Sequence, residues 1–284
     1  MTLEYWYMLP VATGVATVAM ASGVEGATFF APIFLLGLGL PAEVAIGTGL
    51  ITEVFGFASG VTSYVRRGLV DYRLARALLV ATVPAAVLGS LVVGFFRPDI
   101  LEAILGMGLV AVALAFLRAP DHEEVERLDR SVDEDHGAQG ETCILTADGE
   151  EVRYTVCNRL EGRAIAGVGA LFMGMTSTGL GELNGYFLLR RCRVPSRIAV
   201  GTGVLVVAVT ALSAASVHLY HFVKAGGDTL PTVLSLTAFT VPGVLIGGQL
   251  GPALAARVPG HVLEKVLGVL FFLIGVLMLG KVAL

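Results

Sequence analysis

The chain has 284 residues, of which 55% are hydrophobic and only 15% are charged. Soluble domains carry about 25% charged residues, so the composition argues against an ordinary soluble protein, and several apolar runs reach the length of about 20 residues that a helix needs to cross a bilayer. The net charge is −4, but residues 119–162 hold 13 acidic and 4 basic residues, whereas the rest of the chain is net positive. We predict an all-α polytopic membrane protein with no nucleic-acid partner.

The chain opens with two short apolar segments, at about 11–22 and 27–38, on either side of a glycine-rich break. Twelve residues of helix span about 18 Å, which is too short for a hydrocarbon core of about 30 Å. The pair therefore forms either one broken crossing or a re-entrant hairpin that enters the membrane and returns. Three full-length helices follow, at about 42–63, 74–96 and 99–118.

The second half of the chain repeats the first. Three blocks match in the same order: LPAEVAIGTGL (40–50) with VPSRIAVGTGV (194–204), TVPAAVLG (82–89) with TVPGVLIG (240–247), and LEAILGMGL (101–109) with LEKVLGVLF (263–271). The second half accordingly holds short segments at about 164–176 and 183–190 and long helices at about 197–220, 230–255 and 262–282. We predict a first membrane repeat at 1–118, an acidic cytoplasmic linker at 119–162 and a second membrane repeat at 163–284.

Basic residues determine the predicted topology. No Lys or Arg precedes Arg66, after which four arginines cluster in the 64–76 loop, and a second cluster occupies residues 190–197. Cytoplasmic loops are enriched in Lys and Arg, and both clusters are cytoplasmic only if each pair of short segments returns to its starting side. Each half then crosses three times, so the second repeat is inverted, as in many secondary transporters. We expect a multi-pass protein of the plasma membrane with both termini outside the cytoplasm.

The linker contains a candidate β-hairpin. In ETCILTADGEEVRYTVC, at 141–157, a turn at Asp148-Gly149 separates two alternating runs of β-forming residues. We interpret the acidity of the linker as that of a solvated loop, with a partner site as the alternative. The three cysteines are odd in number and unclustered, which predicts reduced thiols rather than a disulfide framework: Cys143, Cys157 and Cys192.

Three acidic residues lie in otherwise apolar segments. Glu25 is the only charged residue within 5–42, and Glu182 occupies the matching break of the second half. Glu53 lies within a long helix, where the second half has Val207. A charged acid in the bilayer costs roughly 2.5–3.5 kcal/mol on insertion scales, so such residues indicate function. We predict that these carboxyls couple transport to protons; capping of a helix N-terminus, a hydrogen bond to a neighbouring helix and cation binding are the alternatives.

The two breaks also gather hydrogen-bond donors. A hairpin tip inside the membrane presents free N–H groups at the start of its second arm, where the helix dipole favours an anion, and glycine lets a ligand approach the backbone closely. The predicted substrate-binding residues combine these glycines with nearby hydroxyl and amide side chains: Ser22, Gly23, Gly26, Thr28, Thr48, Ser177, Thr178, Gly181, Asn184 and Thr202. The set suits a small oxyanion. His218 and His221, near an outer helix end, are expected to be structural.

The two halves resemble the TauE/SafE family of sulfite and organosulfonate permeases, in the 4-toluene sulfonate uptake permease superfamily. The resemblance rests on the tip GVEGATFFAP (23–32) and on the blocks that contain Gly47-Thr48-Gly49 and Gly201-Thr202-Gly203, and it covers the chain except the linker. It implies secondary transport, without ATP, of a small sulfur-containing anion such as sulfite or an organosulfonate. The chain departs from the family pattern where Glu25 and Glu182 interrupt the glycine-rich tips and where the second tip lacks the trailing proline.

A transporter of protons or metal cations that uses the three glutamates is the alternative function. An intramembrane enzyme is disfavoured, because the tips hold no nucleophile with a paired base and the chain holds no HExxH-like metal site. We expect no cofactor and no bound metal. The expected partners are the anion, protons and membrane lipid, and the glycine-rich helices permit a homo-oligomer.

Overall fold

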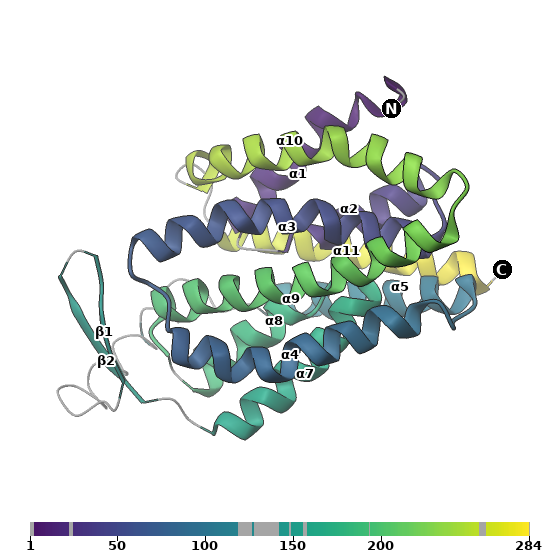
Figure 1. Ribbon diagram of the computed structural model, residues 1–284. Coiled ribbons are helices and arrows are strands. Elements are labelled where there is room, and N and C mark those ends of the chain that lie inside the picture. The colour runs from purple at the N-terminus through teal and green to yellow at the C-terminus, as the bar shows by residue number, and fades with distance from the viewer. Residues whose placement is uncertain are drawn as a thin grey trace.

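Helices make up nearly all of the chain that the structure describes (Figure 1). The structure is a computed structural model, and it describes residues 3–22, 25–118, 127, 142–147, 149–155, 158–192, 194–255 and 260–283. The first half holds η1 (Leu3–Tyr5), α1 (Met8–Ser22), α2 (Ala27–Pro32), η2 (Ile33–Gly37), α3 (Ala42–Arg66), α4 (Tyr72–Val93) and α5 (Pro98–Leu117). The second half holds α7 (Arg159–Thr176), α8 (Leu180–Gly185), η4 (Tyr186–Arg191), α9 (Ser196–Ala225), α10 (Thr229–Ala255) and α11 (Gly260–Ala283).

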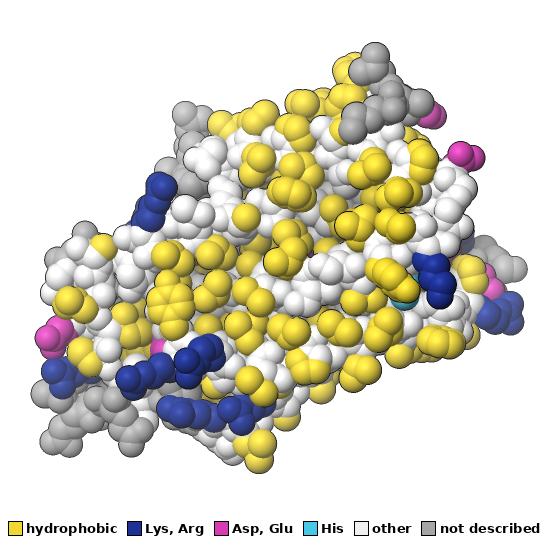
Figure 2. Space-filling model, in the orientation of Figure 1, with side chains coloured by type: hydrophobic (Ala, Val, Ile, Leu, Met, Phe, Trp, Pro, Cys, Tyr) yellow, Lys and Arg dark blue, Asp and Glu magenta, His cyan; other side chains and the backbone are white. Residues whose placement is uncertain are grey.

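Six of these helices are long and apolar enough to cross a membrane: α3, α4, α5, α9, α10 and α11. They are the three long helices predicted in each half, so the prediction of a helical, polytopic membrane protein is confirmed. Figure 2 shows hydrophobic side chains over the middle of one face and Lys and Arg side chains gathered mainly at one end. This is the distribution expected of a protein whose middle lies in lipid and whose ends lie in water.

The short segments of each half are pairs of helices joined by a tip. α1 ends at Ser22 and α2 begins at Ala27, whereas α7 ends at Thr176 and α8 begins at Leu180. In both halves the second arm continues from a short α-helix into a π-helix, η2 or η4. π-Helical turns are rare and are frequent at functional sites. The same irregularity at the same place in both halves is the structural counterpart of the sequence repeat.

Local sequence explains where several helices begin. Pro41 and Pro195 directly precede α3 and α9, with extended ψ angles of 143° and 132° that end the preceding turn. Proline suits this position because it lacks the N–H that a helix start leaves without a partner. Asn158 caps α7, since its side chain accepts hydrogen bonds from Leu160 N at 3.1 Å and Glu161 N at 3.3 Å.

Equivalent helices of the two halves make equivalent contacts. α1 packs against α10 and α7 packs against α4, while α5 packs against α11 and α3 against α9. Two threonine pairs follow the same relation. Thr52 Oγ1 lies 2.9 Å from Thr240 Oγ1, between α3 and α10, and Thr82 Oγ1 lies 2.9 Å from Thr210 Oγ1, between α4 and α9. Each half therefore completes its packing with helices of the other half; the inverted orientation of the repeats stays a prediction.

Glycines allow the exchanged helices to approach closely. A Cβ added to Gly89 on α4 would lie 2.2 Å from Leu171 O on α7. On the equivalent pair, a Cβ added to Gly247 on α10 would lie 2.4 Å from Thr13 O on α1. Helix association inside a bilayer depends on close van der Waals packing rather than on the hydrophobic effect. These glycines are therefore needed for the contacts between the halves.

Two short strands lie between the halves. β1 (Thr142–Leu145) and β2 (Glu151–Tyr154) pair in antiparallel fashion, within the segment where the sequence predicted a hairpin. Cys143 on β1 is a free, exposed thiol, but Cys192 is disulfide-bonded, so the expectation of reduced thiols throughout is wrong at Cys192. Spacing along the chain does not reveal which cysteines the fold brings together. Cys157 lies outside the described residues.

We expect Gly89→Ala to lower the thermal unfolding temperature, because the new methyl group would collide with Leu171 O across the contact of α4 with α7. Overpacking of this kind costs about 1–3 kcal/mol. Gly14→Ala on α1 is the control, since a Cβ there meets nothing within 4 Å and alanine favours a helix over glycine by about 1 kcal/mol. Thermal unfolding in detergent compares the two variants; equal unfolding temperatures would contradict the packing role.

Candidate functional site

The tip of the second half, at 177–179, reverses the chain between α7 and α8. Ser177 has a φ of 61° and Gly179 a φ of 109°, and both values lie in the left-handed region. Glycine adopts this conformation readily, but for a serine it is uncommon, and strained backbone of this kind clusters at active and ligand-binding sites. In the first tip, Gly23 and the side chain of Ser22 lie outside the described residues.

Glu25 connects the two tips. The side chain is buried, and its Oε1 accepts a hydrogen bond from the backbone N–H of Gly181 in the other half. A Cβ added to Gly181 would lie 2.5 Å from Glu25 Oε1, so glycine permits this approach. A carboxyl group of one repeat therefore occupies the start of the second arm of the other repeat.

The other two predicted carboxyls also accept backbone N–H groups at the tips. Glu53 Oε1, on α3, accepts from Ala27 N at the start of α2, at 2.9 Å. Glu182 Oε2 accepts from Gly179 N at 3.1 Å, within its own arm. The first N–H groups of a helix have no partner within the helix, and a carboxylate satisfies them. The capping arrangement that the sequence left open is present at both tips, and it is compatible with a further role in proton coupling.

The three carboxyls lie near one another. Glu25 interacts electrostatically with Glu182 and with Glu53, and Glu53 interacts with Glu182. The described tip residues, 25–27 and 176–185, include no Lys or Arg. Among the residues that the structure describes, no group of three His, Cys, Asp or Glu side chains is placed to hold a metal ion. The described residues of the tips therefore form an acidic, buried region.

Buried polar atoms without a hydrogen-bond partner concentrate at these tips. Within the described ranges they are Glu25 Oε2, Thr28 Oγ1, Thr48 Oγ1, Glu53 Oε2, Glu182 Oε1, both amide atoms of Asn184, and His218 Nδ1. Roughly 90% or more of buried polar groups in proteins are hydrogen-bonded, so each exception calls for an explanation. All except His218 belong to residues that the sequence predicted for the site. Their roles in binding and coupling stay predictions.

Three other predicted residues have side chains that are paired within the protein. Ser177 Oγ donates to Thr176 O at 2.6 Å, and Thr178 Oγ1 lies 3.3 Å from Thr176 Oγ1. Thr202 Oγ1 accepts from Asp71 N at 2.9 Å. The two equivalent threonines of the repeat therefore differ, because the hydroxyl of Thr48 is unpartnered whereas that of Thr202 is engaged.

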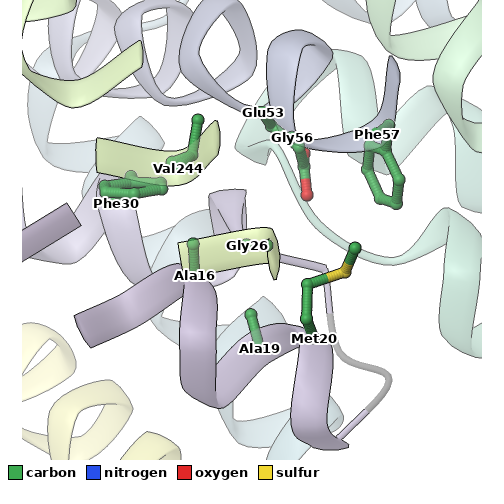
Figure 3. Close-up of a pocket in the computed structure, with 10 residues that line it drawn as sticks. Ala16, Ala19, Met20, Gly26, Phe30, Glu53, Gly56, Phe57 and Val244 are labelled. Carbon is green, nitrogen blue, oxygen red and sulfur yellow. The ribbon is translucent and has the colours of Figure 1, made fainter. Parts of the chain in front are cut away.

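A pocket of about 40 Å³ adjoins Glu53 (Figure 3). Residues of α1, α3 and α10 line it together with Gly26 and Phe30: Ala16, Ala19, Met20, Glu53, Gly56, Phe57, Val244 and Gly248. Glu53 is the only ionisable residue among them. One water molecule needs a cavity volume of about 10–15 Å³, so the pocket has room for a few molecules of the size of water. It is too small for an organic anion, and the Glu53 carboxyl faces an otherwise apolar lining.

The sequence predicts a structural role for His218, and its surroundings are those of a packed residue. The ring is fully buried, and its Nε2 lies 3.0 Å from Gly174 O on α7. A Cβ added to Gly47 on α3 would lie 2.9 Å from His218 Cβ, so His218 also lies in the contact of α3 with α9. Its spacing along the helix indicates that His218 is buried, because it follows the buried Ala211 and Ala214 by seven and four residues and therefore lies on the same helix face.

The comparison with known families decides the identity. A sequence profile described as "Sulfite exporter TauE/SafE" matches residues 8–278. The chain belongs to the TauE/SafE family. Proteins of the TauE/SafE family are membrane transporters and not enzymes, so the resemblance inferred from the sequence is confirmed and the protein is a membrane transporter. The TauE/SafE match spans both repeats, including both tips.

The chain is also similar to bacterial proteins that are described as probable membrane transporters. The chain is 22% identical over 255 residues to "Probable membrane transporter protein YunE" of Bacillus subtilis (strain 168), which covers 89% of this chain and 86% of that protein. It is 24% identical over 247 residues to "Probable membrane transporter protein YjnA" of the same organism, with 83% and 86% covered. A stretch of 96 residues is 33% identical to "Probable membrane transporter protein ORF9" of Sinorhizobium sp, with 34% and 37% covered. No solved structure matches the chain significantly.

We expect Glu53→Leu to destabilise the protein, because it removes the acceptor of the Ala27 N–H from a buried position. An unsatisfied buried donor costs about 1–3 kcal/mol. Glu53→Gln keeps a carbonyl oxygen at this place and should retain most of the stability. Thermal unfolding in detergent measures both variants, with Glu151→Gln at an exposed position of β2 as the control. A Glu53→Leu protein as stable as the wild type would show that the hydrogen bond contributes nothing.

Proposed function

We propose that the protein is a secondary transporter of a small sulfur-containing anion, such as sulfite or an organosulfonate, and that transport is coupled to protons. Membership of the TauE/SafE family supports a permease or exporter. The observation that carries the proposal further is the concentration of unpartnered, buried polar atoms at the two tips, among them those of Thr28, Thr48 and Asn184. These side chains supply hydroxyl and amide donors for an oxyanion.

The carboxyls provide the reason for proton coupling. An anion that enters beside Glu25, Glu53 and Glu182 meets like charges in a medium of low dielectric constant, where repulsion is strong. Protons on the carboxyls remove this repulsion and turn each carboxyl into an O–H donor. Binding of the anion and uptake of protons then favour one another. This mutual preference is the thermodynamic basis of proton-coupled transport.

The backbone N–H groups of the tips join the site when the carboxyls release them. Gly181 N and Ala27 N donate to Glu25 and Glu53. A neutral carboxyl is a weaker acceptor than a carboxylate, so protonation of Glu25 or Glu53 makes these N–H groups available to an anion. The carboxyl and the anion therefore compete for the same donors, and the proton decides which of them is bound.

The pocket beside Glu53 supports a route for the proton. It has a volume of about 40 Å³ and includes the Glu53 side chain in its lining. A water molecule that is hydrogen-bonded to the Glu53 carboxyl in this space can exchange a proton with it. The second repeat has Val207 where the first has Glu53, so this route belongs to the first repeat alone.

A transporter of protons or metal cations is the second candidate, because three buried carboxyls near one another also attract cations. Metal transport has less support, since no group of three His, Cys, Asp or Glu side chains within the described ranges is placed to hold a metal ion. The unpartnered hydroxyl groups of Thr28 and Thr48 and the amide of Asn184 suit an anion better than a bare metal ion.

Uptake of radiolabelled sulfite by proteoliposomes tests the proposal. We expect an inward proton gradient to accelerate uptake, and we expect Glu25→Gln, Glu53→Gln or Glu182→Gln to abolish the acceleration, because an amide does not titrate. Glu151→Gln on β2 is the control. Absence of sulfite flux, together with no competition by sulfonates or thiosulfate in a binding assay, would reject the anion. Protection of the protein against heat by cations alone would then favour the second candidate.

We expect Thr48→Val to raise the KM for the transported anion about tenfold, because valine has the same shape but lacks the unpartnered hydroxyl group. Thr62→Val is the matched control on the same helix, since Thr62 is exposed and its Oγ1 bonds to Ala58 O at 2.8 Å. Initial rates of uptake over a range of anion concentrations give both KM values. If the two variants have the same KM as the wild type, Thr48 does not contact the anion.

A further inference from the structure

The β-hairpin formed by β1 and β2 packs against the loop between α3 and α4. In Figure 1 the hairpin lies at the end of the molecule where α3 turns into α4, opposite the C-terminus. Ala147 N, in the connection of the hairpin, donates to Arg67 O at 2.9 Å. A Cβ added to Gly68 would lie 3.1 Å from Ala147 N and from Leu145 O, and Gly68 has a φ of 68°. The hairpin therefore contacts the backbone of this loop directly, at a glycine in the left-handed conformation.

Tyr154 anchors the hairpin to this loop. The side chain of Tyr154 is fully buried although it belongs to the acidic linker. Its hydroxyl group donates to Asp71 Oδ2 at 2.7 Å, and Asp71 is itself buried. Burial, together with the hydrogen bond to Asp71, raises the pKa of Tyr154, so the hydroxyl remains a donor. Glu150 and Glu151 of the hairpin are exposed, whereas Tyr154 is buried.

Asp71 extends the connection to the second repeat. Its Oδ1 caps α4 by accepting from Arg73 N at 2.8 Å and Leu74 N at 3.0 Å. Its backbone N–H donates to Thr202 Oγ1 on α9, at 2.9 Å. A single residue thus joins the hairpin, the first turn of a helix of the first repeat and a helix of the second repeat.

Two further contacts join α9 to the loop between α3 and α4 and to the hairpin. A Cβ added to Gly201 would lie 2.2 Å from Leu69 O, so the backbone of the loop presses directly on α9. Arg197, in the first turn of α9, forms an ion pair with Glu150 of the hairpin at 3.0 Å. Both side chains of this pair are more than half exposed, so the pair adds little by itself. The buried contact through Tyr154 and Asp71 carries the connection.

Among the described residues, the other end of the molecule has no equivalent hairpin. The loop between α9 and α10, at 226–228, corresponds to the loop between α3 and α4, and in the part of the chain that the structure describes both strands belong to the hairpin. Transporters built from repeats open by moving one repeat or bundle against the other. Contacts that join the repeats at one end are lost when that end opens, so they favour the state in which it is closed.

We propose that the linker hairpin is a clasp that holds the two repeats together at this end of the transporter, and that Tyr154 is its positioning residue, which fixes Asp71 and through it Thr202. The clasp opens whenever the transport cycle opens this end. The inference rests on the membrane transport that the family establishes and not on the identity of the anion.

Hydrogen exchange of the complete protein, followed by mass spectrometry, tests the clasp without a substrate. Tyr154→Phe removes only the buried hydroxyl group, and Tyr220→Phe, at an exposed position on α9, is the matched control. We expect Tyr154→Phe to speed amide exchange about tenfold in the 67–71 loop and in 196–202 of α9, since a hydrogen bond to a charged group is lost. Glu150→Gln should speed it less than about twofold, because it breaks only the exposed pair.

Faster exchange confined to the strands of the hairpin, or no change in either segment, would overturn the clasp, because the hairpin would then be an appendage that does not hold the repeats. Uptake in proteoliposomes gives the second readout. We expect Tyr154→Phe to change the initial rate at least twofold while Tyr220→Phe does not, and equal rates in all three proteins would also overturn the clasp. A wild type without sulfite flux would reject the proposed anion, but the exchange result would still decide on the clasp.

Discussion

The structure depends on how backbone N–H groups are satisfied where a helix begins inside an apolar environment. A bilayer core offers no water to these groups, so the protein must supply the acceptors. Glu53 accepts from Ala27 at the first tip, and Glu25 accepts from Gly181 at the second. The side chains that satisfy these N–H groups therefore occupy the position at which, in the proposed function, an anion binds. In the proposed function the anion competes with these carboxyls for the same N–H groups, and a proton on the carboxyl releases them.

The duplicated scaffold carries a site that is not symmetric. Equivalent helices pack in equivalent ways, through close glycine contacts and matched threonine pairs. The polar side chains at and near the tips differ between the halves. The second half has Val207 at the position equivalent to Glu53. The hydroxyl group of Thr48 has no partner, whereas that of Thr202 accepts a hydrogen bond from Asp71 N. A hairpin at one end adds a further asymmetry. A repeat unit can thus supply the framework while single substitutions assign different tasks to its two copies.

Much of the fold could be predicted because it depends on local composition. Apolar runs of membrane length gave six long helices whose ends differ from the prediction by at most five residues, as in α9, which ends at Ala225. Matched blocks predicted the duplication, and the TauE/SafE resemblance followed from the glycine-rich tips and the two Gly-Thr-Gly blocks. The π-helices after α2 and α8 were not predicted, since a single inserted residue in a helix leaves no periodic signal. The sequence predicted a structural role for His218 but not the contact of its ring with Gly174 O, which depends on how α9 packs against α7.

The sequence by itself determined that the chain is a helical membrane protein, and its matched blocks predict two repeats with acidic and hydroxyl-bearing residues near the tips. Only the tertiary structure decided which of these residues have partners. Glu25 meets Gly181 and Tyr154 meets Asp71 across 156 and 83 residues of chain. Such pairings depend on how segments that are distant in the sequence pack together, and they cannot be predicted from the amino-acid composition or from the hydrophobic periodicity of the chain. A hydroxyl group in the sequence therefore shows that a donor exists, while the packing around it determines whether that donor is free for a ligand.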